Sequence, residues 1–462
     1  MCPGRSAPMV VGEIIHDQWC HSSGEPWIIF TADDHRRAGA ETAIAGQVCR
    51  AACRHSGATG RKHTGRLILV LAGLTAVAPL AVDMYAPGFP GLARAFGAPA
   101  SSVQLSLTAF LVGLAAGQLL LGPVSDAVGR RRVLLAGAAL FTVLSLACAV
   151  SPSIEIFDAA RLLQGVAGAA GMVVARAVLT DRFHGTPEAG RRFATLSAIV
   201  FMAPVAAPVL GGAILGIGSW RLVFTALAGF GVLLIAGLLA WVPESLPAAR
   251  RRSGGVSGVV KAIAMLAGRP ALVGYVLASS FNGAALFTYI AGSTFVFQDV
   301  YGLSATRYSL VFAANALGML ASSVLFGRLS ARVRAGTLFV AGLAVSGTGT
   351  AALVASLATT GGSFAVTWAC LFVTVAGLGT ALPATTTIVQ SLGHDAPGAA
   401  SGLLGGSQFI LGAAASPLSG LLGNGRTVSM AVIMLAAFGL AALSLSLVHG
   451  ARGRAASWRL RH

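Results

Sequence analysis

The chain has 462 residues, of which 55% are hydrophobic and only 10% are charged, and its mean hydropathy is +0.79. A water-soluble protein of this length could not cover its surface with so few polar side chains. The formal net charge is +17, but the basic residues lie in short gaps between apolar runs. Their expected partner is therefore anionic lipid and not nucleic acid, and composition indicates a membrane protein.

Twelve apolar segments are long enough to cross a bilayer, which takes about 20 residues. Since lysine and arginine concentrate in cytoplasmic loops, the basic residues also give the orientation. With the N-terminus inside, 27 of the 32 lie on the cytoplasmic side and 4 on the other, and Arg161 lies within a span. We expect an all-α, multi-pass protein of the cell (inner) membrane with both termini in the cytoplasm. The spans are predicted to begin near Leu67, Val103, Val133, Ile154, Phe193, Leu222, Ala271, Tyr308, Thr337, Ser363, Gly398 and Thr427.

A Pro/Gly/Ser-rich stretch with a run of arginines follows the sixth span and is typical of a linker. It divides the spans into two groups of six. The predicted parts are a polar N-terminal tail over 1–64, a six-helix bundle over 65–248, a cytoplasmic linker over 249–270, a second bundle over 271–448 and a basic tail over 449–462.

The N-terminal tail differs in composition from the rest of the chain. It holds four of the six cysteines and has no apolar stretch long enough for a span or a signal peptide. The spacing of Cys49, Cys53 and His55 does not match a zinc pattern, so no metal site is predicted. Disorder, or a start site assigned too far upstream, is the expected explanation of this segment.

A charged loop between the second and third spans is the most specific motif of the chain. Residues 122–132 read GPVSDAVGRRR. Charge bias alone explains the arginines of a basic cytoplasmic turn, but it does not explain Asp126. A carboxylate there could pair with Arg130, and with Arg176 at the inner end of the fourth span, as a latch between helix ends. Gly122 would permit close helix approach and Gly129 would form the turn.

The two halves of the sequence also resemble each other. The stretch GRLSARVR at 327–334 closes the eighth span as residues 122–132 close the second, with Ala331 in place of Asp126. Two parallel six-helix repeats with a site near the bilayer midplane are the plan of a rocking secondary transporter.

The motifs together resemble the major facilitator superfamily, whose loop between helices two and three carries the GxxxDxxGRRR pattern. Residues 83–90, DMYAPGFP, are similar to the DMYxPxxP of the Bcr/CflA (bicyclomycin and chloramphenicol resistance) drug:proton antiporters, and RLLQG at 161–165 resembles the RxxQG of proton-coupled members. The stretches FNG, YIAGS and VYG between 281 and 302 resemble the group's seventh helix and following loop. Pro204, Pro208, Gly211 and Gly212 resemble the antiporter motif of the fifth helix, although Ala207 stands where many members have glycine.

The resemblance implies a function. It indicates a monomeric transporter, not an enzyme, that works without a cofactor and exports a hydrophobic or amphiphilic drug in exchange for protons by alternating access. A proton-coupled importer of a nutrient or metabolite would share the fold, and the direction of transport would separate the two. The sequence has no phosphate-binding loop, so transport driven by ATP is not expected.

Two charged residues are the candidates for proton coupling. Asp83 ends the first span and Arg161 lies in the outer half of the fourth, so both lie at comparable depth. A charge within a span is costly and usually functional. Asp83 could carry the transported proton, since burial disfavours its ionised form and an approaching Arg161 would favour it. The alternatives are an acid that only marks a helix end and an arginine that extends to the membrane surface.

The predicted drug pocket combines aromatic rings with two amides. Stacking and a few hydrogen bonds would suit an uncharged or weakly polar amphiphile. Packing or an interfacial belt is an equally good explanation for any one of the rings. The proposed substrate-binding residues are Tyr85, Gln164, Phe281, Asn282, Phe287 and Tyr289.

Overall fold

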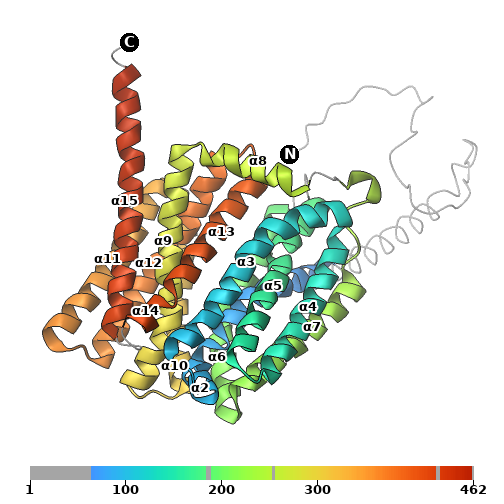
Figure 1. The fold of residues 1–462 in the computed structure, drawn as a ribbon. Coiled ribbons are helices and arrows are strands. Elements are labelled where there is room, and N and C mark those ends of the chain that lie inside the picture. The colour runs from blue at the N-terminus through green and yellow to red at the C-terminus, as the bar shows by residue number, and fades with distance from the viewer. Residues whose placement is uncertain (1–63, 184–188, 252–254, 423–426, 460–462) are drawn as a thin grey trace, which may run out of the picture. The chain divides into compact units, whose positions relative to one another are not determined.

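The computed structural model describes residues 64–183, 189–251, 255–422 and 427–459, and every regular element within them is helical (Figure 1). Eleven of these described helices are long and apolar enough to cross a membrane. Large side chains such as Leu69, Val143 and Leu233 are exposed on them, as expected of a surface that faces lipid. Each helix begins close to its predicted start, which confirms the multi-pass, all-α fold.

The N-terminal half contains the first six long helices. The first covers residues 64–83 and continues through η1 (Ala86–Gly88) and α2 (Phe89–Phe96). The others are α3 (Ala100–Val128), α4 (Arg130–Val150), α5 (Ile154–Phe183), α6 (Ala189–Ile217) and α7 (Trp220–Trp241).

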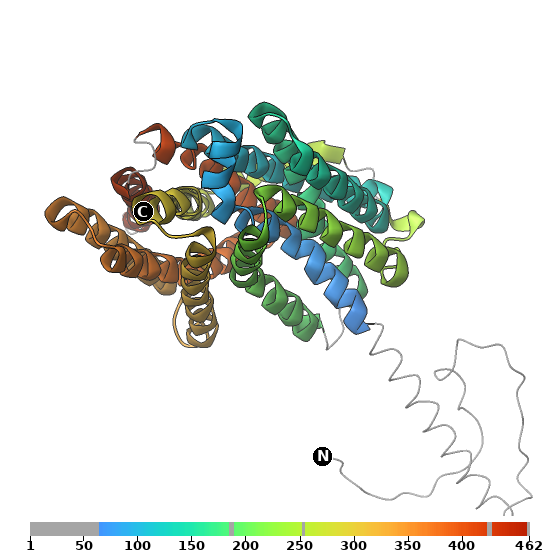
Figure 2. The same ribbon diagram turned by 90° about the horizontal axis from the view of Figure 1, so that it is seen from below.

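The C-terminal half repeats this order. Its helices are α9 (Pro270–Phe295) with the π-helical turn η3 (Val296–Val300), α10 (Ala305–Leu329), α11 (Ala335–Thr360), α12 (Phe364–Leu392), α13 (Pro397–Ala415), α14 (Leu418–Leu421) and α15 (Thr427–Arg459). In the view along the helices, the blue and green helices of the first half lie beside the yellow to red helices of the second (Figure 2).

The helix contacts repeat in the same way as the order. In the N-terminal half α5 packs against α3 and α4, and in the C-terminal half the equivalent α12 packs against α10 and α11. The contacts between the halves are also paired, because the second helix of each half packs against the fifth helix of the other, α3 on α13 and α10 on α6. These contacts confirm the predicted pair of six-helix repeats.

The segment predicted as a span from Gly398 forms α13, which has 19 residues and is not one of the eleven helices that qualify by length and composition. Its polar side chains bond within the bundle, since Ser407 meets Ser280 at 2.8 Å and Gln408 donates to Ser279 on α9. The chain then breaks before α14. Packed between α3 and α9, α13 occupies the place of the remaining helix of the repeat.

Helices also occur in the segments predicted as linker and tail. The predicted linker holds η2 (Ala248–Arg250) and α8 (Gly255–Ala267), and α8 runs across the end of the bundle and contacts α3 and α13 (Figure 1). We call this the basic end, because it carries Arg130, Arg131 and Arg132. Helix α15 extends past residue 448 to Arg459. Apart from Thr64, the predicted N-terminal tail with Cys49, Cys53 and His55 lies outside the described residues.

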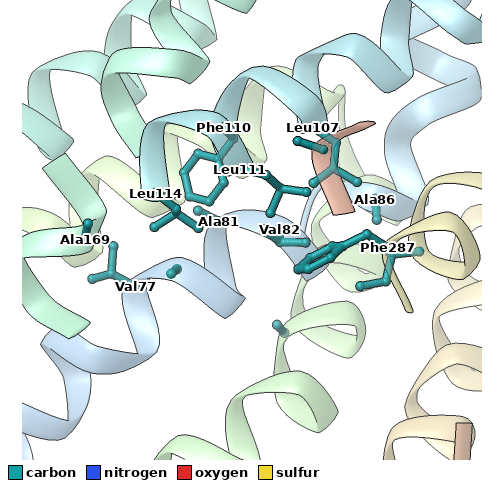
Figure 3. Packing of buried hydrophobic residues seen from close by; sticks show 14 of the residues in the cluster. Val77, Ala81, Val82, Ala86, Leu107, Phe110, Leu111, Leu114, Ala169 and Phe287 are labelled. Atoms are coloured by element: carbon teal, nitrogen blue, oxygen red, sulfur yellow. The ribbon is translucent and has the colours of Figure 1, made fainter. Parts of the chain in front are cut away.

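Glycines set the closest helix contact in the N-terminal half, between α3 and α5. A methyl group at Gly113 would lie 2.0 Å from the carbonyl oxygen of Leu162, and one at Gly165 would lie 2.1 Å from that of Phe110. Such distances are possible only for glycine, so the two backbones touch directly. Beside this contact, Phe110 and Leu114 of α3 pack over Val77 and Ala81 of the first helix (Figure 3).

We predict that Gly165→Ala destabilises the protein. The added methyl group would push α3 away from α5, and overpacking of this kind costs about 1–3 kcal/mol. Thermal unfolding in detergent micelles, followed by circular dichroism, measures the loss. The matched control is Gly229→Ala on α7, where a methyl group would meet no atom within 4 Å. Equal melting temperatures for Gly165→Ala and wild type would contradict this account of the α3–α5 contact.

Candidate functional site

The first helix ends at residue 83, and prolines explain why. Pro87 has no amide hydrogen to bond the carbonyl of Asp83, and Pro90 has none for the carbonyl of Ala86. The chain therefore leaves the α-helix and forms η1, with Pro87 near its start. The sequence motif at 83–90 thus places Asp83 in the last turn of a broken helix.

Asp83 lines a central cavity between the two halves. The cavity has a volume of about 190 Å³, and among its described lining residues Asp83 and Tyr289 are the two whose side chains carry hydrogen-bonding oxygen atoms. Asp83 is 5% exposed and makes no hydrogen bond or ion pair with the part of the chain that the structure describes. The other lining residues are Ala78, Pro79, Val82, Leu111, Leu114, Met172, Pro204, Leu286, Phe287, Ile290, Phe312, Ala316, Met319, Val375 and Phe409.

Arg161 lies near the first helix, but it is not paired with Asp83. Its guanidinium donates to the carbonyl oxygen of Ala81 at 3.1 Å. Ala81 precedes Asp83 by two residues, which is about 200° around a helix. Arg161 therefore approaches the first helix on a different side from the one that carries the Asp83 side chain. Arg161 is fully buried, which excludes extension to the membrane surface.

Aromatic rings and an amide hold Arg161 inside the N-terminal half. The guanidinium carbon lies 4.3 Å from the ring centre of Tyr85 and 4.1 Å from that of Phe110. Gln164 accepts from Arg161 at 2.6 Å and donates to Ser145 at 2.7 Å. Cation–π contacts and hydrogen bonds thus stabilise a buried charge that makes no salt bridge within the described residues, although the Asp158 carboxylate on the same helix lies close enough to interact with it electrostatically. Tyr85 and Gln164, which were predicted to bind substrate, surround Arg161 and do not line the cavity.

The seventh helix supplies two of the predicted pocket residues. Phe287 and Tyr289 of α9 line the cavity, Phe287 beside Phe409 with ring centres 5.8 Å apart. Phe281 is half-buried and does not reach the cavity. Asn282 is fully buried and precedes Leu286 by one turn of α9. Neither polar atom of its amide has a hydrogen-bond partner within the described residues.

The proline and glycine residues of α6 lie where three helices meet. Pro204 lines the cavity, whereas Pro208 lies one turn further along α6. A methyl group at Gly211 would lie 2.0 Å from the carbonyl oxygen of Met84, and one at Gly212 would lie 2.2 Å from the Ser309 hydroxyl of α10. Adjacent glycines therefore let α6 touch the broken helix of its own half and α10 of the other half.

Hydrogen bonds between the halves gather at the end opposite the basic end. Thr294 donates to the carbonyl of Ala86 at 2.9 Å, and Gln298 donates to that of Pro87 at 2.8 Å. The carbonyls exposed by the broken helix are thus bound by α9 and η3. Thr306 of α10 also donates to Gly212 at 3.1 Å.

Gln104 adds a further link between the halves at this end. It is fully buried on α3, and its amide donates to the carbonyl of Ala291 at 3.2 Å and to Ser419 at 3.1 Å. Its oxygen accepts from the amide of Gly420 at 3.0 Å. Gln104 was not predicted as a site residue, although an amide within an apolar span was a usable signal.

The ion pairs of the basic end lie within single halves. Asp126 pairs with Arg130 at 2.6 Å, as predicted, and Arg130 also meets Asp181 of α5 at 3.2 Å. Arg176 is exposed and bonds to neither acid. The pairs that the structure describes here tie α3 to α4 and α5, so they do not bridge the two halves.

The glycines of this loop and one missed acid shape the start of α4. Gly129 has a φ of +114°, which favours glycine. Its turn allows Glu244 to accept from the backbone amides of Arg130 and Arg131 at 3.0 and 3.3 Å, where the helix dipole also favours an anion. Gly122 has only an ordinary contact, since a methyl group there would lie 3.6 Å from Val173.

A larger hollow of about 640 Å³ opens at the basic end, lined by Arg131, Arg182 and Trp241 among others. All of its lining residues belong to the N-terminal half or to the chain just after α7. Movement of one half against the other would not expose it alternately to the two sides of a membrane. The central cavity, which both halves line, is therefore the stronger candidate for a transport site.

Sequence relatives identify the family. Residues 71–417 match the Major Facilitator Superfamily. The uncharacterized MFS-type transporter YdgK of Bacillus subtilis (strain 168) is 38% identical over 379 residues, which cover 81% of this chain and 93% of that protein. A bicyclomycin resistance protein homolog of Haemophilus influenzae is 30% identical, covering 62% and 71% of the two chains. A chloramphenicol resistance protein of Pseudomonas aeruginosa is 32% identical, covering 57% and 61%.

Solved structures agree on the fold. The xylose transporter XylE from E. coli, in a partially occluded inward-open conformation, aligns with a TM-score of 0.66 at 16% identity, over 83% of this chain and 97% of that one. These findings confirm the predicted resemblance and a transporter in place of an enzyme. The chain therefore belongs to the major facilitator superfamily, and its relatives named for drug resistance place it with the drug-efflux type.

Proposed function

We propose that the protein exports a hydrophobic or amphiphilic drug in exchange for protons, with Asp83 as the group that carries the proton. The observation that carries the proposal is the position of Asp83, which is the one charged side chain among the described residues of an apolar cavity lined by both halves. An ionised carboxylate in such a place is costly unless it takes up a proton or meets a cation. The relatives named for bicyclomycin, chloramphenicol and multidrug resistance support drug export.

Alternating access is part of the proposal. The bonds of Gln104, Thr294 and Gln298 join the halves at the end opposite the basic end, whereas the described ion pairs of the basic end stay within single halves. This asymmetry supports a state that is closed to the outside. In this proposal the protein is a monomer in the inner membrane, and its basic end and both termini lie in the cytoplasm. Transport then requires the outer bonds to break while Asp126, Arg130 and Asp181 move together as one body.

Arg161 is proposed to position the proton carrier without pairing with it. It holds the Ala81 carbonyl in the last turn of the first helix, and a cation at a helix C-terminus also stabilises the helix dipole. Because Asp83 lies in the same turn, its place in the cavity depends on this contact. Since no cation among the described residues pairs with Asp83, its carboxyl group can exchange a proton with whatever enters the cavity.

Import of a nutrient is the remaining alternative, because the same cavity and the same acid would serve it. The direction of movement separates the two. Inside-out membrane vesicles given an acidic interior take up chloramphenicol or bicyclomycin if the protein exports these drugs in exchange for protons. Uptake only by vesicles of the opposite orientation would favour the importer.

We predict that Asp83→Asn abolishes uptake driven by a proton gradient in inside-out vesicles. An amide has the shape of the carboxylic acid but cannot release a proton. Accumulation of radiolabelled chloramphenicol should fall to the level of vesicles without the protein, while exchange of labelled for unlabelled drug without a gradient persists.

The control for this experiment is Asp299→Asn, the same chemical change at an exposed carboxylate in η3. It should transport like wild type. If Asp83→Asn still accumulates drug in response to the gradient at the wild-type rate, Asp83 does not carry the proton and the proposed mechanism is wrong.

Alternating access predicts that a covalent link at the outer end stops transport. A β-carbon at Gly216 of α6 would lie 3.4 Å from the Thr306 hydroxyl of α10, which suits a disulfide. In a variant without the native cysteines, Gly216→Cys with Thr306→Cys should lose drug transport on oxidation and regain it on reduction. Each single variant should be insensitive to oxidant, and full transport by the cross-linked protein would rule out opening at this end.

A further inference from the structure

Three side chains of the C-terminal half form a hydrogen-bonded chain that leads into the cavity. The indole Nε1 of Trp368 on α12 donates to Oδ1 of Asn315 on α10 at 3.1 Å. Asn315 Nδ2 donates to the hydroxyl of Tyr289 on α9 at 2.8 Å. Asn315 is fully buried, and Tyr289 is the member that lines the cavity.

The donor-only indole fixes the direction of every bond in this chain. An indole N–H can only donate, so the Asn315 oxygen must face Trp368 and its NH₂ group must face Tyr289. The phenol oxygen of Tyr289 therefore accepts, and its own hydrogen is left to bond elsewhere. Because the cavity lining is mostly apolar, the local dielectric is low and a hydrogen bond from this donor is electrostatically stronger than it would be in water.

The surroundings of Tyr289 offer few acceptors within the protein. Ser293, one turn along α9, shares a 2.8 Å hydrogen bond with Tyr308 and also lies close to the Tyr289 hydroxyl, so it can compete with a ligand for this hydrogen. Among the described residues that line the cavity, Asp83 is the only other one with a side-chain oxygen or nitrogen. Around the hydroxyl the walls are apolar and aromatic, with Phe312 stacked on Tyr289 at 5.4 Å and 22° between the ring planes.

We infer that Tyr289 is a specificity-determining residue that donates a hydrogen bond to the transported molecule. The substrate class is then an aromatic, mainly apolar compound that carries an uncharged acceptor such as a carbonyl oxygen. Asn315 and Trp368 are positioning residues, since they act through Tyr289. This inference rests on the proposed function, because that function makes the bound ligand a transported molecule. The inference itself concerns ligand selection and not proton coupling.

The test compares two compounds that differ only in the acceptor, benzophenone and diphenylmethane. Binding of each, radiolabelled, is measured to the full protein in lipid nanodiscs, with empty nanodiscs as the blank and no proton gradient. Wild type should bind benzophenone about 3- to 10-fold more tightly, the range expected for one neutral hydrogen bond. Tyr289→Phe should bring the ratio to about 1, because only the hydroxyl is lost, and leave the affinity for diphenylmethane unchanged.

Two further variants make the result specific. Tyr308→Phe removes a buried hydroxyl that does not line the cavity and should keep the wild-type preference. Trp368→Phe frees the Asn315 amide to turn and accept from Tyr289, so the preference should fall although the cavity wall is untouched. Retained diphenylmethane binding shows that each variant is folded.

The inference is overturned if wild type shows no preference for benzophenone or binds neither compound, if Tyr289→Phe keeps the preference, or if Trp368→Phe leaves it intact. These outcomes are independent of Asp83→Asn in the transport assay. If Asp83→Asn keeps gradient-driven accumulation while the benzophenone preference depends on Tyr289, the proposed mechanism is wrong and the inference on ligand selection stands. If Asp83→Asn abolishes accumulation while the preference does not depend on Tyr289, the mechanism stands and the inference is wrong.

Discussion

The break in the first helix is the constraint on which the rest of the site depends. Pro87 and Pro90 remove two amide hydrogens, and the helix cannot continue past Asp83. A broken helix at this depth is tolerated only if its carbonyls find partners within the protein. One side chain of the N-terminal half, Arg161, binds the last turn, and Thr294 and Gln298 of the C-terminal half bind the segment that follows.

This arrangement assigns different tasks to the two halves. The N-terminal half contributes the charged residues of the site. Arg161 is enclosed between aromatic rings, and Asp83 lines the cavity. The C-terminal half contributes an uncharged chain of donors that ends at Tyr289. Between the halves, the contact of Gly212 with α10 and the bonds of Gln104 are made of small or neutral groups. Such contacts can separate without leaving an unpaired charge in the membrane, as a rocking transporter requires.

Much of the fold follows from the sequence, because length and hydropathy alone mark membrane helices. The spans, the repeat of six helices and the place of Asp83 at a helix end were predictable. The direction of a side chain was not, because these helices are apolar on most sides and periodicity does not show which face meets which neighbour. Depth suggested that Arg161 and Asp83 would pair, but helical geometry turns them apart. The same limit explains why Tyr85 and Gln164 were assigned to the pocket and why Asn315 and Gln104 were missed.

The central claim is that drug and proton compete at Asp83, and proton release on drug binding tests it most directly. Purified protein in lightly buffered detergent solution, near the pH at which Asp83 is half protonated, is mixed with saturating chloramphenicol, and a pH indicator counts the protons released. We expect release from wild type that disappears in Asp83→Asn, with the effect declining at higher and lower pH. Drug binding by wild type with no proton released at any pH would contradict the account.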